Sequence, residues 1–242
     1  MARLLLSISP CLGLVHLIAS SVPVDPTKGF VSLPLNQSNF DVQRPYDVPE
    51  DQRYSFRHGV HKLWVYSSDK RHAPTSRTKP RTEIRISGYD YSSGVWQFEG
   101  SAYVPHGTSG VCIMQVFGAS PHATTAALVV YNGTLSYYTN TVLLENIYDR
   151  WFKVNVIHDA NASTAKVYID YQLKAVAPGR GEATHYFKCG VYAQRYPSYY
   201  MESRWKGIKV LKMSDLDLFF YNQVDLVVTT FVITTESTTI KV

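Results

Sequence analysis

Short stretches rich in β-branched and aromatic residues recur along this chain and restrict what it can fold into. They are separated by Gly, Pro, Asn and Asp, and no stretch of useful length shows a convincing helical period. They cover residues 60–67, 82–89, 94–104, 111–117, 126–131, 134–138, 150–158, 165–170, 186–194 and 205–211. Many short strands with polar turns predict an all-β protein, an antiparallel sandwich or jelly roll.

The 242 residues, with 45% hydrophobic content, are enough for one full core, so we expect a single domain. Residues 25–53 are rich in Pro, Asn and Asp and predict an extended entry segment. Residues 54–212 carry the strand signals. Residues 213–242 form a divergent tail with an acidic start and a Thr-rich end, to which we assign no function.

The N-terminus has the pattern of a secretory signal peptide, which we place at residues 1–24. Arg3 precedes a largely apolar run, Leu4–Ala19, that is short for a membrane-spanning helix, so an uncleaved anchor is the weaker alternative. Glycosylation sequons begin at Asn36, Asn132 and Asn161. We therefore expect passage through the secretory pathway to the cell exterior, the cell wall or a vacuole, with no stable membrane span.

Three of the strand segments place polar residues on one face and apolar residues on the other, because residues two apart in a strand share a face. The polar faces carry Arg81, Glu83 and Arg85; Gln115 and Phe117; and Tyr186, Lys188, Tyr192 and Gln194. Alternating charges on a strand are commonly only ion pairs on a solvated surface. Taken together, however, the arginine guanidinium groups, the lysine charge and the tyrosine hydroxyls predict a basic groove that binds carboxylates.

Without the signal peptide, two cysteines remain, Cys112 and Cys189. In regular strands both would point away from the polar face, towards the core. There, either a buried thiol pair or one disulfide is reasonable, and a catalytic thiolate is not.

The formal charge of +5 favours anionic partners but does not identify them. The basic stretch 70–85 also allows a nucleic-acid patch, but Pro74, Pro80, the secretory context and the lack of a nucleic-acid motif argue against it.

His58 and His61 lie three apart in a strand-like region and so on opposite faces, which disfavours a shared metal. We expect no metal, no cofactor and no nucleic-acid partner.

The same three segments resemble the signature blocks of the alginate lyases of polysaccharide lyase family seven. The matching stretches are Arg81-Thr82-Glu83-Ile84-Arg85, Gln115-Val116-Phe117 and Tyr186-Phe187-Lys188-Cys189-Gly190-Val191-Tyr192-Ala193-Gln194. Within that superfamily, residues 30–212 look most like the plant citrate-binding proteins. The resemblance implies a concanavalin-like β-jelly roll whose ligand is citrate, another small carboxylate or an acidic polysaccharide.

In the lyases that this chain resembles, an Arg and a Gln neutralise the sugar carboxylate, and a Tyr and a His exchange protons in a β-elimination. The matching positions here are Arg81, Gln115 and Tyr192. Phe117 stands where the family has its histidine, and His122, five residues on, would have to reach back from a loop. We therefore expect a carboxylate-binding protein, with an active polyuronate lyase using Tyr192 as the alternative.

Overall fold

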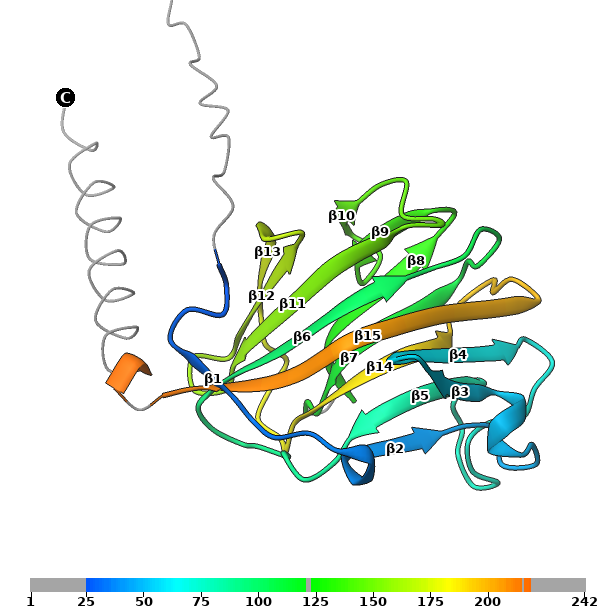
Figure 1. The fold of residues 1–242 in the computed structure, drawn as a ribbon, viewed down its shortest axis with the longest axis horizontal. Helices are drawn as coiled ribbons and strands as arrows, with labels where there is room; N and C mark the ends of the chain where they lie inside the picture. The colour runs from blue at the N-terminus through cyan, green and yellow to red at the C-terminus, as the bar shows by residue number, and fades with distance from the viewer. Residues whose placement is uncertain (1–24, 121–122, 215, 219–242) are drawn as a thin grey trace, which may run out of the picture.

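The computed structural model describes residues 25–120, 123–214 and 216–218, which form two antiparallel sheets packed face to face (Figure 1). The eight-stranded sheet has the order β13-β12-β11-β6-β15-β4-β3, with β1 paired to β15. The seven-stranded sheet has the order β10-β9-β8-β7-β14-β5-β2. This arrangement confirms the predicted all-β jelly roll of two antiparallel sheets.

The strands are β1 (Phe30–Ser32), β2 (Phe40–Gln43), β3 (Tyr54–Arg57), β4 (Val60–Tyr66), β5 (Arg81–Ile86), β6 (Val95–Tyr103), β7 (Val111–Phe117), β8 (Thr124–Tyr131), β9 (Thr134–Tyr137), β10 (Thr141–Leu144), β11 (Trp151–Asp159), β12 (Thr164–Ile169), β13 (Gln172–Pro178), β14 (Tyr186–Ala193) and β15 (Tyr200–Met213). Two short 3₁₀ turns, η1 (Gln37–Asn39) and η2 (Glu50–Gln52), join the first strands.

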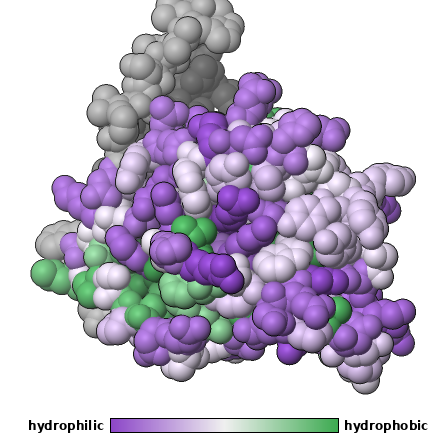
Figure 2. Space-filling model, turned by 45° about the vertical axis from the view of Figure 1, so that its right-hand side comes forward, coloured by the Kyte–Doolittle hydropathy of each residue, from purple (hydrophilic) through white to green (hydrophobic). Residues whose placement is uncertain are grey.

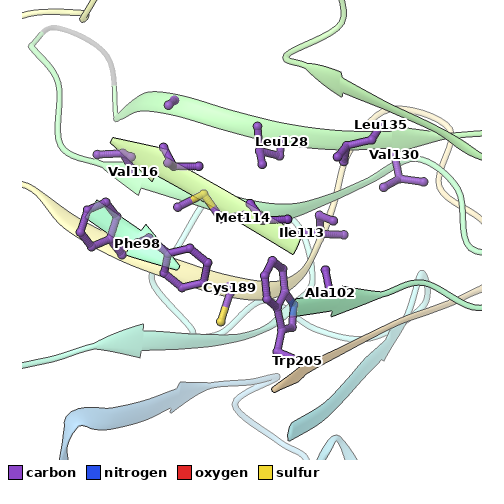
Figure 3. Packing of buried hydrophobic residues seen from close by; sticks show 14 of the residues in the cluster. Phe98, Ala102, Ile113, Met114, Val116, Leu128, Val130, Leu135, Cys189 and Trp205 are labelled. Carbon is purple, nitrogen blue, oxygen red and sulfur yellow. The ribbon is translucent and has the colours of Figure 1, made fainter. Parts of the chain in front are cut away.

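The hydrophobic core lies between the sheets (Figure 3). Phe98 of β6 and Trp205 of β15 come from the eight-stranded sheet, and Met114 of β7 and Leu128 of β8 come from the other. In β4 and β12 buried positions alternate with partly exposed ones, as expected of strands with one face in the core. The opposite faces of both sheets are therefore free to carry polar side chains.

The entry segment, residues 25–53, contributes strands to both sheets. β1 pairs with the end of β15, and β2 pairs with β5. The predicted signal peptide, residues 1–24, and tail residues 215 and 219–242 lie outside the described residues. Among the residues that are described, no helix is both long enough and apolar enough to cross a membrane.

Asn132 and Gly133 form the turn of the hairpin between β8 and β9. Both residues have positive φ, 47° and 80°, as a two-residue type I′ turn requires, and Tyr131 pairs with Thr134 across it. The sequon residues Asn36, Asn132 and Asn161 are all exposed. Glycan attachment to them remains a prediction.

The central strands β7 and β14 are not regular. The pairing of β14 with β7 shifts between Cys189 and Tyr192, and the pairing of β7 with β8 shifts between Cys112 and Met114. Ile113 and Met114, although adjacent, both point into the core (Figure 3). The parity of side chains along β7 therefore reverses at this β-bulge.

Two histidines are buried away from the polar face of the seven-stranded sheet. His61 and His158 are 5% and 1% exposed, and the Nδ1 atom of each forms a 2.9 Å hydrogen bond with a tyrosine hydroxyl, that of Tyr54 and Tyr91 respectively. Burial lowers the pKa of His61 to about 4 and that of His158 to about 3, where the neighbouring His185 adds to the shift. The fold therefore keeps both imidazoles neutral.

This neutrality predicts that acid destabilises the fold. These histidines have a lower pKa in the folded state than in the unfolded state, where it is near 6.5. Their contribution to stability is therefore fully present above pH 6.5. It is lost as the pH falls from 6.5 towards the folded-state pKa, because the unfolded state then binds protons more readily. At pH 5 the unfolded state gains roughly 2 kcal/mol from protonating each histidine. We expect denaturant titrations at pH 7 and pH 5 to show a smaller pH-dependent loss of unfolding free energy in His158→Gln than in the wild type. Replacing the exposed His106 by Gln should leave that loss unchanged, and an equal loss in His158→Gln would contradict the prediction.

Candidate functional site

The polar residues predicted to converge do so on the outer face of the seven-stranded sheet. Lys188 of β14 lies opposite Arg85 of β5 and Gln115 of β7, and Tyr192 lies opposite Arg81. Four adjacent strands, β7, β14, β5 and β2, thus form the floor of the candidate site.

Glu83 is the centre of this arrangement. Its carboxylate is fully buried and accepts hydrogen bonds from Arg81 Nη1 at 3.0 Å and from Gln115 Nε2, and Lys188 Nζ lies 3.6 Å from it. We call Arg81, Glu83, Gln115 and Lys188 the Glu83 cluster. The predicted residue Glu83 therefore holds the cationic groups in place, because a buried carboxylate needs such partners.

The Glu83 cluster carries more positive than negative charge. Arg81 and Lys188 are 5% and 2% exposed, and only Glu83 among the cluster's side chains is acidic, which leaves a surplus of one positive charge. Arg81 Nε is buried and has no hydrogen-bond partner among the described residues. Lys188 Nζ donates to Gln43 Oε1 of β2 at 2.6 Å. Burial lowers the pKa of Lys188, and the charge of Glu83 opposes that shift.

Aromatic rings flank the cluster. The Arg81 guanidinium lies 3.9 Å from the centre of the Tyr192 ring, and Lys188 Nζ lies 5.2 Å from that of Phe117. Phe117 also stacks on Tyr186, with ring centres 4.8 Å apart. Phe117, which the sequence resemblance matches to the lyase histidine, thus forms part of an aromatic wall beside the lysine.

The other predicted residues lie at the margins. Arg85 packs 4.1 Å from the Tyr186 ring centre and forms an ion pair with Asp90, which compensates its charge. Burial raises the pKa of Tyr186, and Arg85 opposes that shift. Gln194 follows the end of β14 and donates from its amide to the backbone oxygens of Tyr192 and Ala193.

His72 is a site residue that the sequence reasoning missed. It lies in the connection between β4 and β5, and its Nδ1 is 3.4 Å from Thr78 Oγ1. Burial lowers the pKa of His72, the positive charges of Arg81 and Lys188 lower it further, and the Glu83 carboxylate opposes that shift. Strand parity carries no information about a residue in such a connection. His122, considered from the sequence, lies outside the described residues.

The end of the β4–β5 connection is fixed to the end of β14. Lys79 Nζ donates to the Gln194 backbone oxygen at 2.7 Å, and the Ala193 amide donates to the Pro80 oxygen at 3.0 Å. These bonds place the chain before Arg81 against the strand that carries Tyr192.

The prediction that both cysteines face the core is wrong for Cys112. The bulge in β7 turns Cys112 to the outer face, where it contacts the hydrophobic group that includes Tyr192, whereas Cys189 lies in the core as predicted. The two thiols are free and lie on opposite faces of the sheet, so the alternative of a disulfide is not realised. Burial raises the pKa of both thiols well above its usual value, which disfavours thiolate chemistry.

The site can bind an anion by charge and by hydrogen bonds. A carboxylate entering beside Arg81 meets a guanidinium, an ammonium and the Gln115 amide, all held by Glu83. In the part of the chain that the structure describes, no group of three or more His, Cys, Asp or Glu side chains is arranged to hold a metal ion.

Comparison with known sequences and folds gives a consistent result. The sequence model of the alginate lyase family matches residues 33–212. A citrate-binding protein of Hevea brasiliensis is 54% identical to this chain over 189 residues, which are 78% of this chain and 79% of that protein.

Among solved structures, the alginate lyase AlgAT5 of polysaccharide lyase family 7 has a TM-score of 0.57 at 17% identity and matches 71% of this chain and 93% of its own. Alginate lyase A1-II′ of the same family has a TM-score of 0.58 at 14% identity and matches 73% of this chain and 96% of its own. At these identities the likeness shows the jelly-roll fold alone. The match over residues 33–212 and the 54% identity to the Hevea protein show that the chain belongs to the alginate lyase family.

Proposed function

We propose that this protein binds citrate or a similar small carboxylate at the Glu83 cluster. The observation that carries the proposal is the buried positive surplus of the cluster together with the unpartnered Arg81 Nε. A buried donor without a partner is costly, and an anionic acceptor would satisfy it. The name of the Hevea relative supports the choice of citrate among carboxylates.

The geometry suits an acid with several carboxylates. One carboxylate would pair with the Arg81 guanidinium, since Arg binds carboxylates through two parallel hydrogen bonds. A second would lie near Lys188, and the partly exposed Tyr192 and Tyr186 would border the entrance. Low exposure strengthens each of these charged contacts relative to a solvated surface.

We also propose that the protein reaches the secretory pathway, as the N-terminal pattern predicts. The exposure of Asn36, Asn132 and Asn161 supports this proposal, because glycans require accessible acceptors.

Removing the Arg81 guanidinium should weaken citrate binding. We expect Arg81→Gln to lose at least tenfold in affinity by isothermal titration calorimetry, because a hydrogen-bonded charge pair contributes about 1.5–3 kcal/mol. Arg81→Lys should keep the charge and the fold but recover only part of the affinity. Arg57→Gln, on a strand of the other sheet, provides the control for loss of one positive charge.

Circular dichroism and thermal unfolding would confirm that each variant is folded before its affinity is compared. Undiminished citrate affinity in folded Arg81→Gln would place citrate elsewhere. Absence of binding heat in the wild type at millimolar citrate would reject the proposal itself.

The second candidate function is β-elimination on a polyuronate. The observation that favours it is His72, whose pKa is lowered by burial and by the charges of Arg81 and Lys188, together with Tyr192, whose ring packs on the Arg81 guanidinium. Arg81 and Gln115 would neutralise the uronate carboxylate, which acidifies the neighbouring C–H, and His72 or Tyr192 would take that proton. A C=C double bond would form as the C–O bond to the leaving sugar breaks, and Tyr192 would donate the proton that the leaving oxygen needs. Phe117, which replaces the family histidine, argues for binding as the principal function.

An absorbance assay separates the two functions. Elimination creates an unsaturated uronate that absorbs in the near ultraviolet, and we expect no such increase when the protein is mixed with polymannuronate, glucuronan or polygalacturonate. An increase that Tyr192→Phe and His72→Gln both abolish would instead establish the lyase activity. A wild-type increase that survives both substitutions would assign the activity to other residues or to a contaminant.

A further inference from the structure

The outer face of the eight-stranded sheet, on the opposite side of the sandwich from the Glu83 cluster, has its own regular arrangement of side chains. In β15, Arg204 lies opposite Lys62 of β4 on one side and Tyr103 of β6 on the other. Trp151 of β11 lies opposite Tyr103. Core residues alternate with these positions along each strand. The four side chains, those of Lys62, Tyr103, Trp151 and Arg204, therefore project outward. They form one continuous row across four neighbouring strands.

Three cations on this face lie over aromatic rings. Lys206 Nζ is 4.2 Å from the Trp151 ring centre, and the Arg204 guanidinium is 5.0 Å from that of Tyr103. Lys62 Nζ lies 5.2 Å from the centre of the Trp64 ring. We call these six residues, Lys62, Trp64, Tyr103, Trp151, Arg204 and Lys206, the aromatic–cation face.

The aromatic–cation face has few acidic partners, and these are either buried or at its margin. Glu202 is 3% exposed and accepts from Arg204 Nε at 2.7 Å, with Lys62 Nζ at 3.2 Å. Asp149 accepts a 3.0 Å hydrogen bond from the Tyr103 hydroxyl at the margin. The three cations therefore exceed the two acids by one, and the Lys62 and Arg204 side chains remain 38% and 39% exposed.

The face continues along the strands into a hollow. From Glu202 to Lys209, β15 runs roughly 20 Å at the usual strand rise. There, a hollow of about 360 Å³ is lined by residues that include Glu99, Lys153, Tyr171 and Lys209. Both lysines lie 3.0 Å from the Glu99 carboxylate. The outer face of this sheet thus carries further polar and aromatic groups beyond the aromatic–cation face.

Figure 2 shows one side of the molecule, where strongly hydrophilic residues are interspersed with pale residues of intermediate hydropathy, and the green hydrophobic residues lie mostly towards the left and the centre of the view. An apolar protein partner would require a larger hydrophobic patch.

We infer that the aromatic–cation face is a second binding surface, whose occupant is an extended segment of an acidic polysaccharide. The C–H face of a sugar ring packs on Trp or Tyr, and the carboxylates of a uronate chain match the adjacent Arg and Lys. A linear polymer can contact cations and rings on several strands at once, whereas a small acid would reach only one or two of these cations. This inference does not depend on what the Glu83 cluster binds.

Affinity electrophoresis of the full-length protein in gels containing polygalacturonate tests the inference. The wild type should be retarded, and Trp151→Ala and Lys206→Gln should each weaken binding by about fivefold, since each removes one stacking or charge contact. Neither side chain belongs to the hydrophobic core between the sheets, so both variants should remain folded. Lys174→Gln, on the edge strand β13, is the control for loss of one positive charge.

Two further arms distinguish this face from the Glu83 cluster. Saturating citrate and the Arg81→Gln variant should both leave the retardation unchanged. Retardation that citrate or Arg81→Gln abolishes, while Trp151→Ala and Lys206→Gln have no effect, would overturn the inference and place the polymer at the cluster. Equal retardation by a neutral glucan would contradict the role of charge, and mobility unaffected by polygalacturonate would reject the surface altogether.

Discussion

The buried carboxylate of Glu83 is the interaction on which the rest of the site depends. It brings together one side chain from each of β7 and β14 and another from β5 itself, and Lys188 extends the network to β2 through Gln43. Without Glu83, two cations with 5% and 2% exposure would repel each other in a medium that solvates them poorly. Removing one partner of a buried ion pair typically costs about 3–5 kcal/mol. The Glu83 carboxylate therefore stabilises the buried positive charges of Arg81 and Lys188 at the candidate site.

That network requires the strands β5 and β14 to approach closely, and the backbone at Gly190 meets this requirement. Its φ is 143°, and a Cβ atom there would lie 2.3 Å from the Thr82 carbonyl oxygen. Any larger residue would separate the two strands that carry Arg81 and Lys188. On the other side of the sheet, Ser203 Oγ donates to the Gly190 oxygen at 2.7 Å, which ties this point to β15 of the facing sheet. The bulge next to Gly190 is thus a condition for the geometry of the site.

The sequence allowed the fold class and most of the cluster to be predicted, because both follow from alternation along strands. Arg81, Lys188 and Tyr192 lie together as parity indicates, since β5 and β14 pair without a shift over these residues. Gln115 of β7 joins them because it pairs with Lys188 outside the shifted part of the β7–β14 pairing. The same rule failed for Cys112, because a bulge inserts a residue without leaving a mark in the hydrophobic pattern. Gln43 and His72 were missed because their positions depend on tertiary contacts. One lies on a short strand within an apparently irregular segment, and the other lies in a connection without periodicity.

The two outer faces of the sandwich hold their cations in different ways, and this difference determines what each can recognise. In the Glu83 cluster the charges are desolvated and fixed by hydrogen bonds, so a ligand must match them closely and dissolved salt screens them little. On the aromatic–cation face, Lys62 and Arg204 are more than a third exposed, and single contacts there are weak and screened. Weak contacts bind usefully only when many of them act together, as they do along a polymer. Moderate salt should therefore distinguish the two proposed binding activities. It would weaken the affinity of the aromatic–cation face for a polymer while leaving the affinity of the Glu83 cluster for a carboxylate largely unchanged.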